Sequence, residues 1–197
     1  SGETYILTDA TAGANVWTNV GGGDGDVQKD HQGTQHGYQA GGYTGADSNV
    51  IDKFSFTSDA NATDHSDMVS ARHTVVGSQD ITHGYIAGGN GNSNIIERIP
   101  FATTANSVSV GTLTVGKSTN SRMSNSGVMS LTHGYSRGGR ATASIIRNNI
   151  IDRFPFATDS DATDVGDLEA VGSNFGFNGQ QSLTHGYCTG GEHIAGN

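Results

Sequence analysis

Short apolar stretches recur along the chain between longer polar segments, and three of them align with one another. They cover residues 50–56, 95–101 and 150–156, and each begins with two aliphatic residues and ends on phenylalanine. Apolar runs of this length, bounded by turn-forming residues, predict strands, and no segment has the period of an amphipathic helix. Pro100 and Pro155 fall at one equivalent position near the end of these strands, where proline's missing N–H suits a strand end. We therefore expect an all-β protein.

A longer repeat contains these strands. The sequence His-Gly-Tyr, two variable residues and Gly-Gly occurs four times, at residues 36–42, 83–89, 133–139 and 185–191. Successive copies start 47, 50 and 52 residues apart. Each unit accommodates about four short strands, which is the size of a β-propeller blade.

Several features of the unit resemble a kelch repeat. They are the double glycine after a strand, the acidic-basic pair inside the apolar strand, and the arginines Arg72 and Arg122. The resemblance covers essentially the whole chain, although the tryptophan of kelch blades has a counterpart only in Trp17. It implies a degenerate, kelch-like propeller.

The two ends of the chain look like complementary halves of one unit. Residues 5–9 stand as far before His36 as residues 154–158 stand before His185, whereas no strand is expected after Gly191. We expect a single domain, 1–197, with units of about 36–82, 83–132 and 133–184, and a fourth from 185–197 plus 1–35. The predicted fold is a four-bladed kelch-like β-propeller with one blade closed by the N- and C-terminal segments, which would cover exposed strand edges. An open stack of repeats, or a piece of a larger ring or fibre, is the alternative.

Composition and charge exclude some partners. The net charge is −9 with ten Lys and Arg, so no basic stripe for nucleic acid is expected. No stretch approaches the length of a membrane span, so membrane insertion is not expected either. Cys188 is the single cysteine, which rules out an internal disulfide.

The motif histidines and tyrosines allow two interpretations. In a closed ring the histidines would lie around a pseudo-fourfold axis, where a histidine cluster can bind a metal. The interpretation we favour is structural: each imidazole bonds the backbone of the turn before its strand, and the motif packs between blades. The residues concerned are His36, Tyr38, His83, Tyr85, His133, Tyr135, His185 and Tyr187.

Two polar loops carry oxygen side chains at alternating positions, as calcium loops do. The candidate metal ligands are Asp59, Asn61, Asp64, Asp159, Asp161 and Asp164. The corresponding loop of the second unit lacks the pattern, and Asp, Asn and Thr also form turns with their own backbone. We favour turn formation, expect no cofactor other than possible calcium, and find no motif for nucleophilic catalysis.

The function of a propeller lies in its variable loops. Tyr43, Arg140, Phe175 and Phe177 lie in these loops, and aromatic side chains on polar loops suit stacking on a glycan. The repeat, together with residues 17–26, also resembles His-Gly-Tyr/Gly-Gly repeat proteins of marine tailed phages, especially cyanophages.

The phage resemblance implies a non-enzymatic virion appendage or tail-fibre component, located on the virion or outside the cell. Its partners would be other virion or surface proteins, or a cell-surface glycan. Two alternatives stay open: a metal-binding enzyme that uses the histidine ring or the acidic loops, and an intracellular kelch-type protein-interaction module. Whether copies of the chain associate is left open too.

Overall fold

The computed structural model describes residues 3–9, 16–22, 35–117, 126–139, 149–169, 178–182 and 184–189. These residues form strands joined by turns, and no helix is found among them. The prediction of an all-β protein is confirmed. The chain divides into two compact units, Ser1–Gln32 and Gly33–Asn197.

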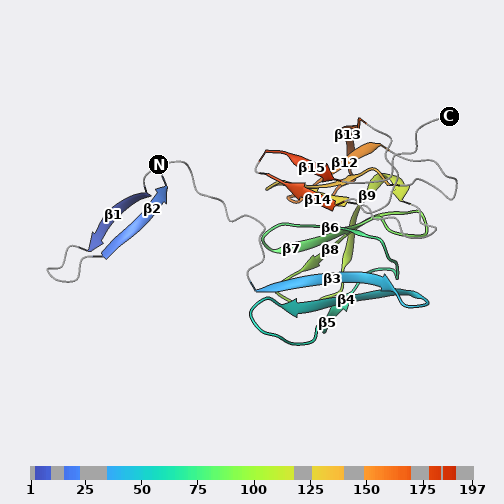
Figure 1. The fold of residues 1–197 in the computed structure, drawn as a ribbon, viewed down its shortest axis with the longest axis horizontal. Coiled ribbons are helices and arrows are strands. Elements are labelled where there is room, and N and C mark those ends of the chain that lie inside the picture. Colours follow the sequence, from blue (N-terminus) through green and yellow to red (C-terminus); the bar gives the residue numbers. More distant parts are fainter. Residues whose placement is uncertain are drawn as a thin grey trace. The chain divides into compact units, whose positions relative to one another are not determined.

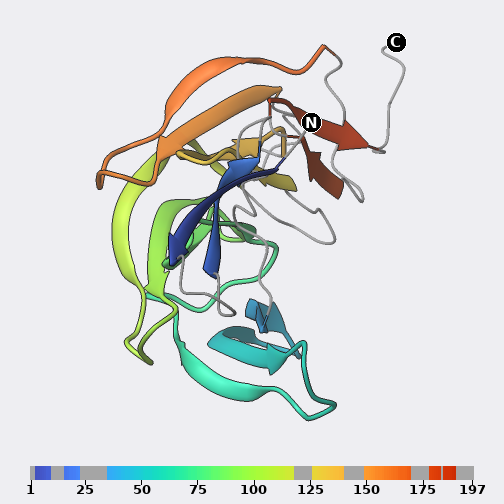
Figure 2. The ribbon, with the colours of Figure 1, turned by 90° about the vertical axis from the view of Figure 1, so that its left-hand side faces the viewer.

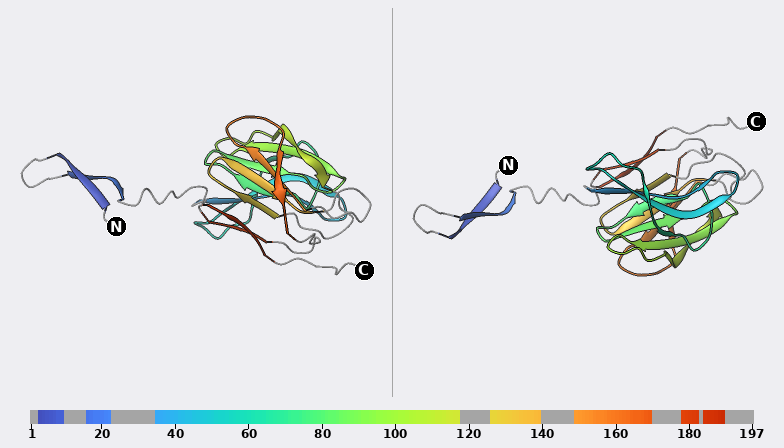
Figure 3. Two further views of the ribbon diagram at one scale, coloured as in Figure 1. Left: turned by 90° about the horizontal axis from the view of Figure 1, so that it is seen from above. Right: turned by 90° about the horizontal axis from the view of Figure 1, so that it is seen from below.

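The first unit is a β-hairpin. It consists of β1 (Glu3–Asp9) and β2 (Val16–Gly22), which pair in antiparallel fashion and are drawn in blue in Figure 3. The ladder contains two irregularities, between Thr4 and Tyr5 and between Leu7 and Asp9.

The second unit contains four antiparallel sheets that follow one another in chain order (Figures 1 and 2). The first sheet has β3 (His36–Tyr43), β4 (Asp47–Ser55) and β5 (Thr63–Asp67). The second sheet has β6 (Val76–Gln79), β7 (His83–Ala87), β8 (Ser93–Pro100) and β9 (Val108–Lys117). The third sheet has β10 (Ser126–Met129), β11 (His133–Arg137), β12 (Ile150–Pro155) and β13 (Thr163–Asp167). The fourth sheet has β14 (Asn178–Gln181) and β15 (Gly186–Thr189).

Each sheet is an open meander in which strands adjacent in sequence pair with each other. The His-Gly-Tyr strand is paired on both sides in the second and third sheets, by β6 and β8 around β7 and by β10 and β12 around β11. The expected strands are therefore present, whereas the closed four-bladed ring and the single domain stay predictions.

The Gly-Gly pair is explained by the backbone at the end of the His-Gly-Tyr strand. Gly41 and Gly88 have φ angles of 62° and 67°, and the glycines after them, Gly42 and Gly89, have 148° and 116°. This is the left-handed region that L-residues with side chains rarely adopt. Both positions of the pair thus favour glycine, at the bulge within β3 in the first sheet and directly after β7 in the second.

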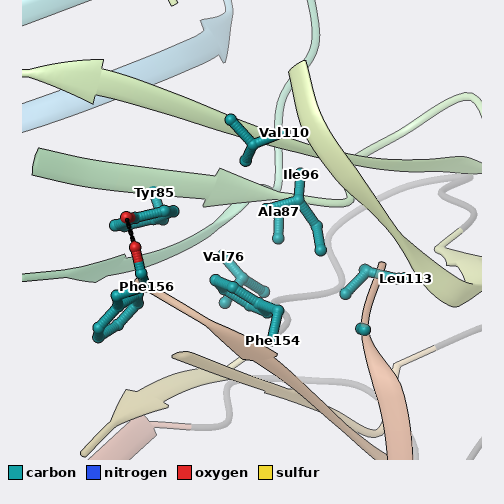
Figure 4. Packing of buried hydrophobic residues seen from close by; sticks show 9 residues of the cluster. Val76, Tyr85, Ala87, Ile96, Val110, Leu113, Phe154 and Phe156 are labelled. Atoms are coloured by element: carbon teal, nitrogen blue, oxygen red, sulfur yellow. Dashed lines mark hydrogen bonds between the residues drawn. The ribbon is translucent and has the colours of Figure 1, made fainter. Parts of the chain in front are cut away.

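The hydrophobic core lies between the sheets. One cluster joins the second and third sheets and contains Val76, Tyr85, Ala87, Ile96, Val110, Leu113, Phe154, Phe156 and Ala162 (Figure 4). A smaller cluster joins the first and second sheets and contains Ile51, Met68, Ile86 and Ile99. Met68 and Leu113, which occupy equivalent positions of the first two repeat units, are among these buried residues.

Candidate functional site

The turn before each His-Gly-Tyr strand has one recurring hydrogen-bond pattern. The side chain three residues before the histidine, Asp80 in the second sheet, accepts the N–H groups of Thr82 (2.6 Å) and His83 (2.7 Å). Ser130 and Ser182 occupy this position in the next two sheets. Burial would raise the pKa of Asp80, but the hydrogen bonds from Thr82 and His83 lower it below 3.8. The carboxylate therefore stays charged as it closes the turn.

The motif histidines contact a threonine hydroxyl in the same turn. His83 Nδ1 lies 2.7 Å from Thr82 Oγ1, and His133 Nδ1 lies 2.8 Å from Thr132 Oγ1. His185 has the same contact with the threonine that precedes it. We expected the imidazole to bond turn backbone, and its partner is a side chain instead. A threonine recurs immediately before the histidine in the sequence, and this recurrence could have predicted the contact.

The motif tyrosines pack against the following sheet. Tyr38 stacks on Phe101, with ring centroids 4.9 Å apart, and Tyr85 stacks on Phe156 at 4.6 Å. Tyr85 also donates a hydrogen bond to the carbonyl of Phe156 (3.0 Å; Figure 4). Burial, helped by the Asp80 carboxylate, raises the pKa of Tyr85 to about 12, so the hydroxyl remains a donor. One contact thus recurs at two boundaries between sheets.

The glycine between histidine and tyrosine makes room for a large side chain. The ring of Phe54 lies over Gly37, and the ring of Phe154 lies over Gly134. Both rings come from the strand that pairs with the His-Gly-Tyr strand. An aromatic ring on the paired strand needs this space because a Cβ would overlap it.

The acidic loop of the third repeat unit forms an ion pair and hydrogen bonds with the second sheet. Asp159 pairs with Arg98 at 2.7 Å, and Asp161 Oδ1 accepts the N–H (2.8 Å) and the hydroxyl (2.9 Å) of Thr112. Asp164 accepts the N–H of Gly166 two residues later. The loop of the first unit, with Asp59, Asn61 and Asp64, is exposed. Across the described residues, no group of three or more His, Cys, Asp or Glu is arranged to hold a metal ion.

A buried ion pair joins the first two repeat units, 36–82 and 83–132. Arg72 lies in the segment after β5, Glu97 lies on β8, and the two side chains form a salt bridge. Glu97 Oε2 also accepts the N–H of Val69 (3.0 Å) and the hydroxyl of Ser107, and Arg72 Nε donates to the carbonyl of Gly88 (2.8 Å). The acidic member of the repeated acidic-basic pair is thus a structural group between units.

The most distinctive polar cluster with access to solvent lies between the first and second sheets. It contains Tyr43 at the end of β3, Asp47 at the start of β4, His73 between β5 and β6, and Asn90 between β7 and β8. His73 Nδ1 lies 2.6 Å from Asp47 Oδ1, and Asn90 donates to Asp47 Oδ2 (2.6 Å). Two further bonds join Asn90 and His73: His73 N–H to Asn90 Oδ1 and Asn90 N–H to His73 carbonyl, both 3.0 Å.

This cluster combines an aromatic surface with fixed polar groups. The ring of Tyr43 is 64% exposed and lies 5.3 Å from the His73 ring. The hydrogen bond from Asn90, followed by that from His73, lowers the pKa of Asp47 below 3.8, so its carboxylate is charged at neutral pH. Since Asp47 holds Nδ1, the other ring nitrogen of His73 has no protein partner in the described part of the chain and can bond a ligand.

Backbone strain accompanies the cluster. Thr74, next to His73, has a φ of 56°, a region that a β-branched residue rarely adopts. Such strain costs about 1–3 kcal/mol and is concentrated at binding and catalytic sites. The segment that carries His73 is bonded to both sheets, because the Arg72 carbonyl accepts the N–H of Gly42 in the first sheet and the His73 carbonyl accepts the N–H of Asn90 in the second.

Of the four predicted ligand-binding residues, the structure describes Tyr43. Arg140, Phe175 and Phe177 lie outside the described residues. Counted from His-Gly-Tyr, Arg140 is equivalent to Tyr43 and Asn90, the residues that directly follow Gly-Gly. Phe175 is equivalent to His73. Sequence reasoning missed His73 and Asn90, although the variability of the position after Gly-Gly was a signal for Asn90.

A cavity of about 340 Å³ lies between the third and fourth sheets. Its lining includes Val128, Tyr135, Ile151, Leu168 and His185. Tyr135 is the third motif tyrosine and lines this cavity. At the two preceding boundaries between sheets, the equivalent tyrosines Tyr38 and Tyr85 each stack on a phenylalanine.

No protein-family model matches the chain, and no curated protein matches it. The likeness to kelch repeats and to phage repeat proteins therefore rests on the motif residues themselves. Within the described ranges there is no helix with the length and hydropathy needed to cross a membrane.

Proposed function

We propose that the sheets are the blades of a four-bladed, kelch-like propeller, with β1–β2 as the outer half of the fourth blade. Supporting this, β1–β2 has the dimensions of the outer hairpins of the first three sheets. All four hairpins contain one residue pair 17 positions apart and another 10 positions apart: Thr4–Gly21 and Leu7–Trp17, Val50–Asp67 and Lys53–Thr63, Ile95–Thr112 and Arg98–Val108, Ile150–Asp167 and Arg153–Thr163.

The match also refines the sequence alignment. It equates Tyr5 with Ile51, Ile96 and Ile151, whereas counting back from His-Gly-Tyr equates Tyr5 with Phe154. The fourth sheet, β14–β15, contains only the inner half of a blade, so the two hairpins together supply four strands.

We further propose that the propeller is a non-enzymatic module that binds a glycan, and that it serves in a virion appendage or on another surface. The observation that carries this proposal is the cluster of Tyr43, Asp47, His73 and Asn90. An exposed aromatic ring offers a stacking face for the apolar side of a sugar. The carboxylate, imidazole and amide beside it offer acceptors and donors for hydroxyl groups.

The repeated and the variable residues have different roles, and this difference supports a binding function. The repeated residues take part in turns and in packing between sheets, as the contacts of Tyr85 and His83 illustrate. The cluster instead uses residues that change from unit to unit, and Arg140 and Phe175 belong to the same variable positions. A face of variable residues on a repeated scaffold is the usual arrangement of a binding surface.

The test is a glycan array probed with the full chain and with two variants. Tyr43→Ala removes the stacking ring from the cluster. Ile81→Ala is the matched control, because Ile81 is also exposed but lies in the turn at the opposite end of the His-Gly-Tyr strand. We expect glycan binding that Tyr43→Ala abolishes and Ile81→Ala preserves. Binding that is equally strong in Tyr43→Ala, or no binding to any glycan, would contradict the proposal.

Elemental analysis of the same preparation separates this function from the metal-enzyme alternative. We expect less than one metal ion per chain, and glycan binding that is unchanged by a chelator. A stoichiometric metal ion that is required for binding or for turnover would reject a metal-free binding module.

A further inference from the structure

One face of the first sheet is exposed where the third sheet is covered. Phe54 and Phe56 are 39% and 55% exposed, whereas their counterparts Phe154 and Phe156 are 1% and 8% exposed. The residue types are the same, so the difference lies in what covers them. In the third sheet the cover is Tyr85, which comes from the second sheet.

The exposed phenylalanines already have the geometry that receives a tyrosine. The rings of Phe54 and Phe56 meet edge-on, at 5.5 Å and 86°, as those of Phe154 and Phe156 do at 6.1 Å and 74°. Among the described residues no tyrosine stacks on the first pair. The pair therefore repeats one half of a contact that is complete between the second and third sheets.

The other half is present on the fourth sheet. Tyr187 is the motif tyrosine of the last unit, on β15, and it is 51% exposed. Its counterpart Tyr85 is 2% exposed and is sandwiched against the phenylalanine pair of the next sheet. Exposed tyrosine on the last sheet and exposed phenylalanines on the first sheet are complementary surfaces of a single chain.

We infer that Tyr187 stacks on Phe56 of the same chain and so closes the ring between the fourth and the first blade. This inference rests on the proposed four-bladed fold. Tyr38 and Tyr85 each pack on the sheet that follows their own, and in a ring of four the sheet after the fourth is the first. The closing contact is thus the same tyrosine–phenylalanine stack that Tyr38 and Tyr85 make.

A polar contact on the same face supports the stacking of Tyr187 on Phe56. At the boundaries between the first and second sheets and between the second and third sheets, Asn106 and Asp161 each accept an N–H from the preceding sheet, from Asp67 (3.1 Å) and Thr112 (2.8 Å). Asn61 is the equivalent residue of the first sheet and is exposed. The first sheet therefore presents both the aromatic and the polar acceptor groups of a boundary between blades.

A double-mutant cycle on the full chain tests the contact. The variants are Phe56→Leu, Tyr187→Leu and the double substitution, and the equilibrium constant for unfolding is measured by urea titration. We expect non-additivity of about two- to tenfold, the range of aromatic pairs. The cycle of Phe101→Leu and Tyr38→Leu is the positive control, because that stack is present in the structure. Additive effects for Phe56 and Tyr187 beside a coupled control pair would overturn the inference.

Ring-to-ring NMR contacts provide a second readout that needs no substitution. We expect a nuclear Overhauser effect between the rings of Phe56 and Tyr187 in the unsubstituted chain, present at high dilution. If a mixture of labelled and unlabelled chains shows that the contact is between chains, the closing partner is a second copy and the inference is wrong. Glycan binding by the Tyr43 cluster is measured separately, so failure of either proposal can be recognised on its own.

Discussion

The salt bridge between Arg72 and Glu97 gives the largest effect that we expect from one substitution. Both side chains are almost completely buried, at 2% and 0% exposure. Glu97→Gln keeps the shape of the side chain and removes its charge, which leaves the guanidinium of Arg72 buried without its counter-ion. Removing one partner of a buried pair costs about 3–5 kcal/mol. The loss is measured as the change in the free energy of unfolding in urea titrations.

The neighbouring residue supplies the control. Arg98 pairs with Asp159 at the surface, where the side chains are 27% and 52% exposed. Exposed pairs contribute about 0–1 kcal/mol, so Arg98→Gln should have a small effect. The double substitution Arg72→Met with Glu97→Leu should recover much of the loss, because no charge is then left unpaired. A change below about 1 kcal/mol for Glu97→Gln would refute this explanation of the repeated acidic residue.

Three further substitutions test the packing and the titration of the repeat. Gly134→Ala should cost about 1–3 kcal/mol in urea titrations because a Cβ would overlap the buried Phe154 ring, whereas Gly77→Ala, with open space around it, should cost little. Tyr85→Phe should cost about 1 kcal/mol through the lost hydrogen bond to a carbonyl of the next sheet; an unchanged stability would contradict that role. Burial, followed by a neighbouring positive charge, lowers the pKa of His133 below 6.5, so the unfolded chain binds the proton first and stability falls as the pH drops through 6.5. His133→Gln should therefore flatten the fall of the melting temperature between about pH 7 and about pH 5, and an unchanged slope would reject it.

The elements of the fold could be predicted because they are encoded locally. The copies of His-Gly-Tyr lie at the starts of β3, β7, β11 and β15, and Pro100 and Pro155 end their strands as expected. Positive φ angles at Gly41 and Gly42 show why the pair is glycine. Such patterns need only the backbone preferences of single residues.

The candidate site could not be predicted in the same way, because its groups come together only when two sheets pack. Asp47 lies 26 residues before His73, in the same unit of the repeat, and 43 residues before Asn90, which belongs to the next unit. His73 stands in a non-repeating loop, where the sequence gives no period to follow. Tyr43 was found because an aromatic residue in a polar loop is conspicuous, but its polar neighbours depend on packing between sheets.

The buried charges were missed for the same reason. Charged residues are mostly exposed, so the sequence of the acidic-basic pair gives no sign that its acidic member is buried. In the structure the acidic residue Glu97 points between sheets and is buried, while the basic residue Arg98 is partly exposed. Alternation along a strand separates the two faces, yet only the neighbouring Arg72 makes burial of the acidic one possible.

Small-angle X-ray scattering on the full chain, coupled to size-exclusion chromatography, tests the closed four-bladed ring most directly. A closed ring predicts a monomer of 20.3 kDa whose radius of gyration is about 16 Å, as expected for a compact single domain of this length. A radius well above about 20 Å in a monomer would mean that the N-terminal hairpin is not part of the ring. A mass of two or more chains would mean that the units join between copies, and either result would contradict the account.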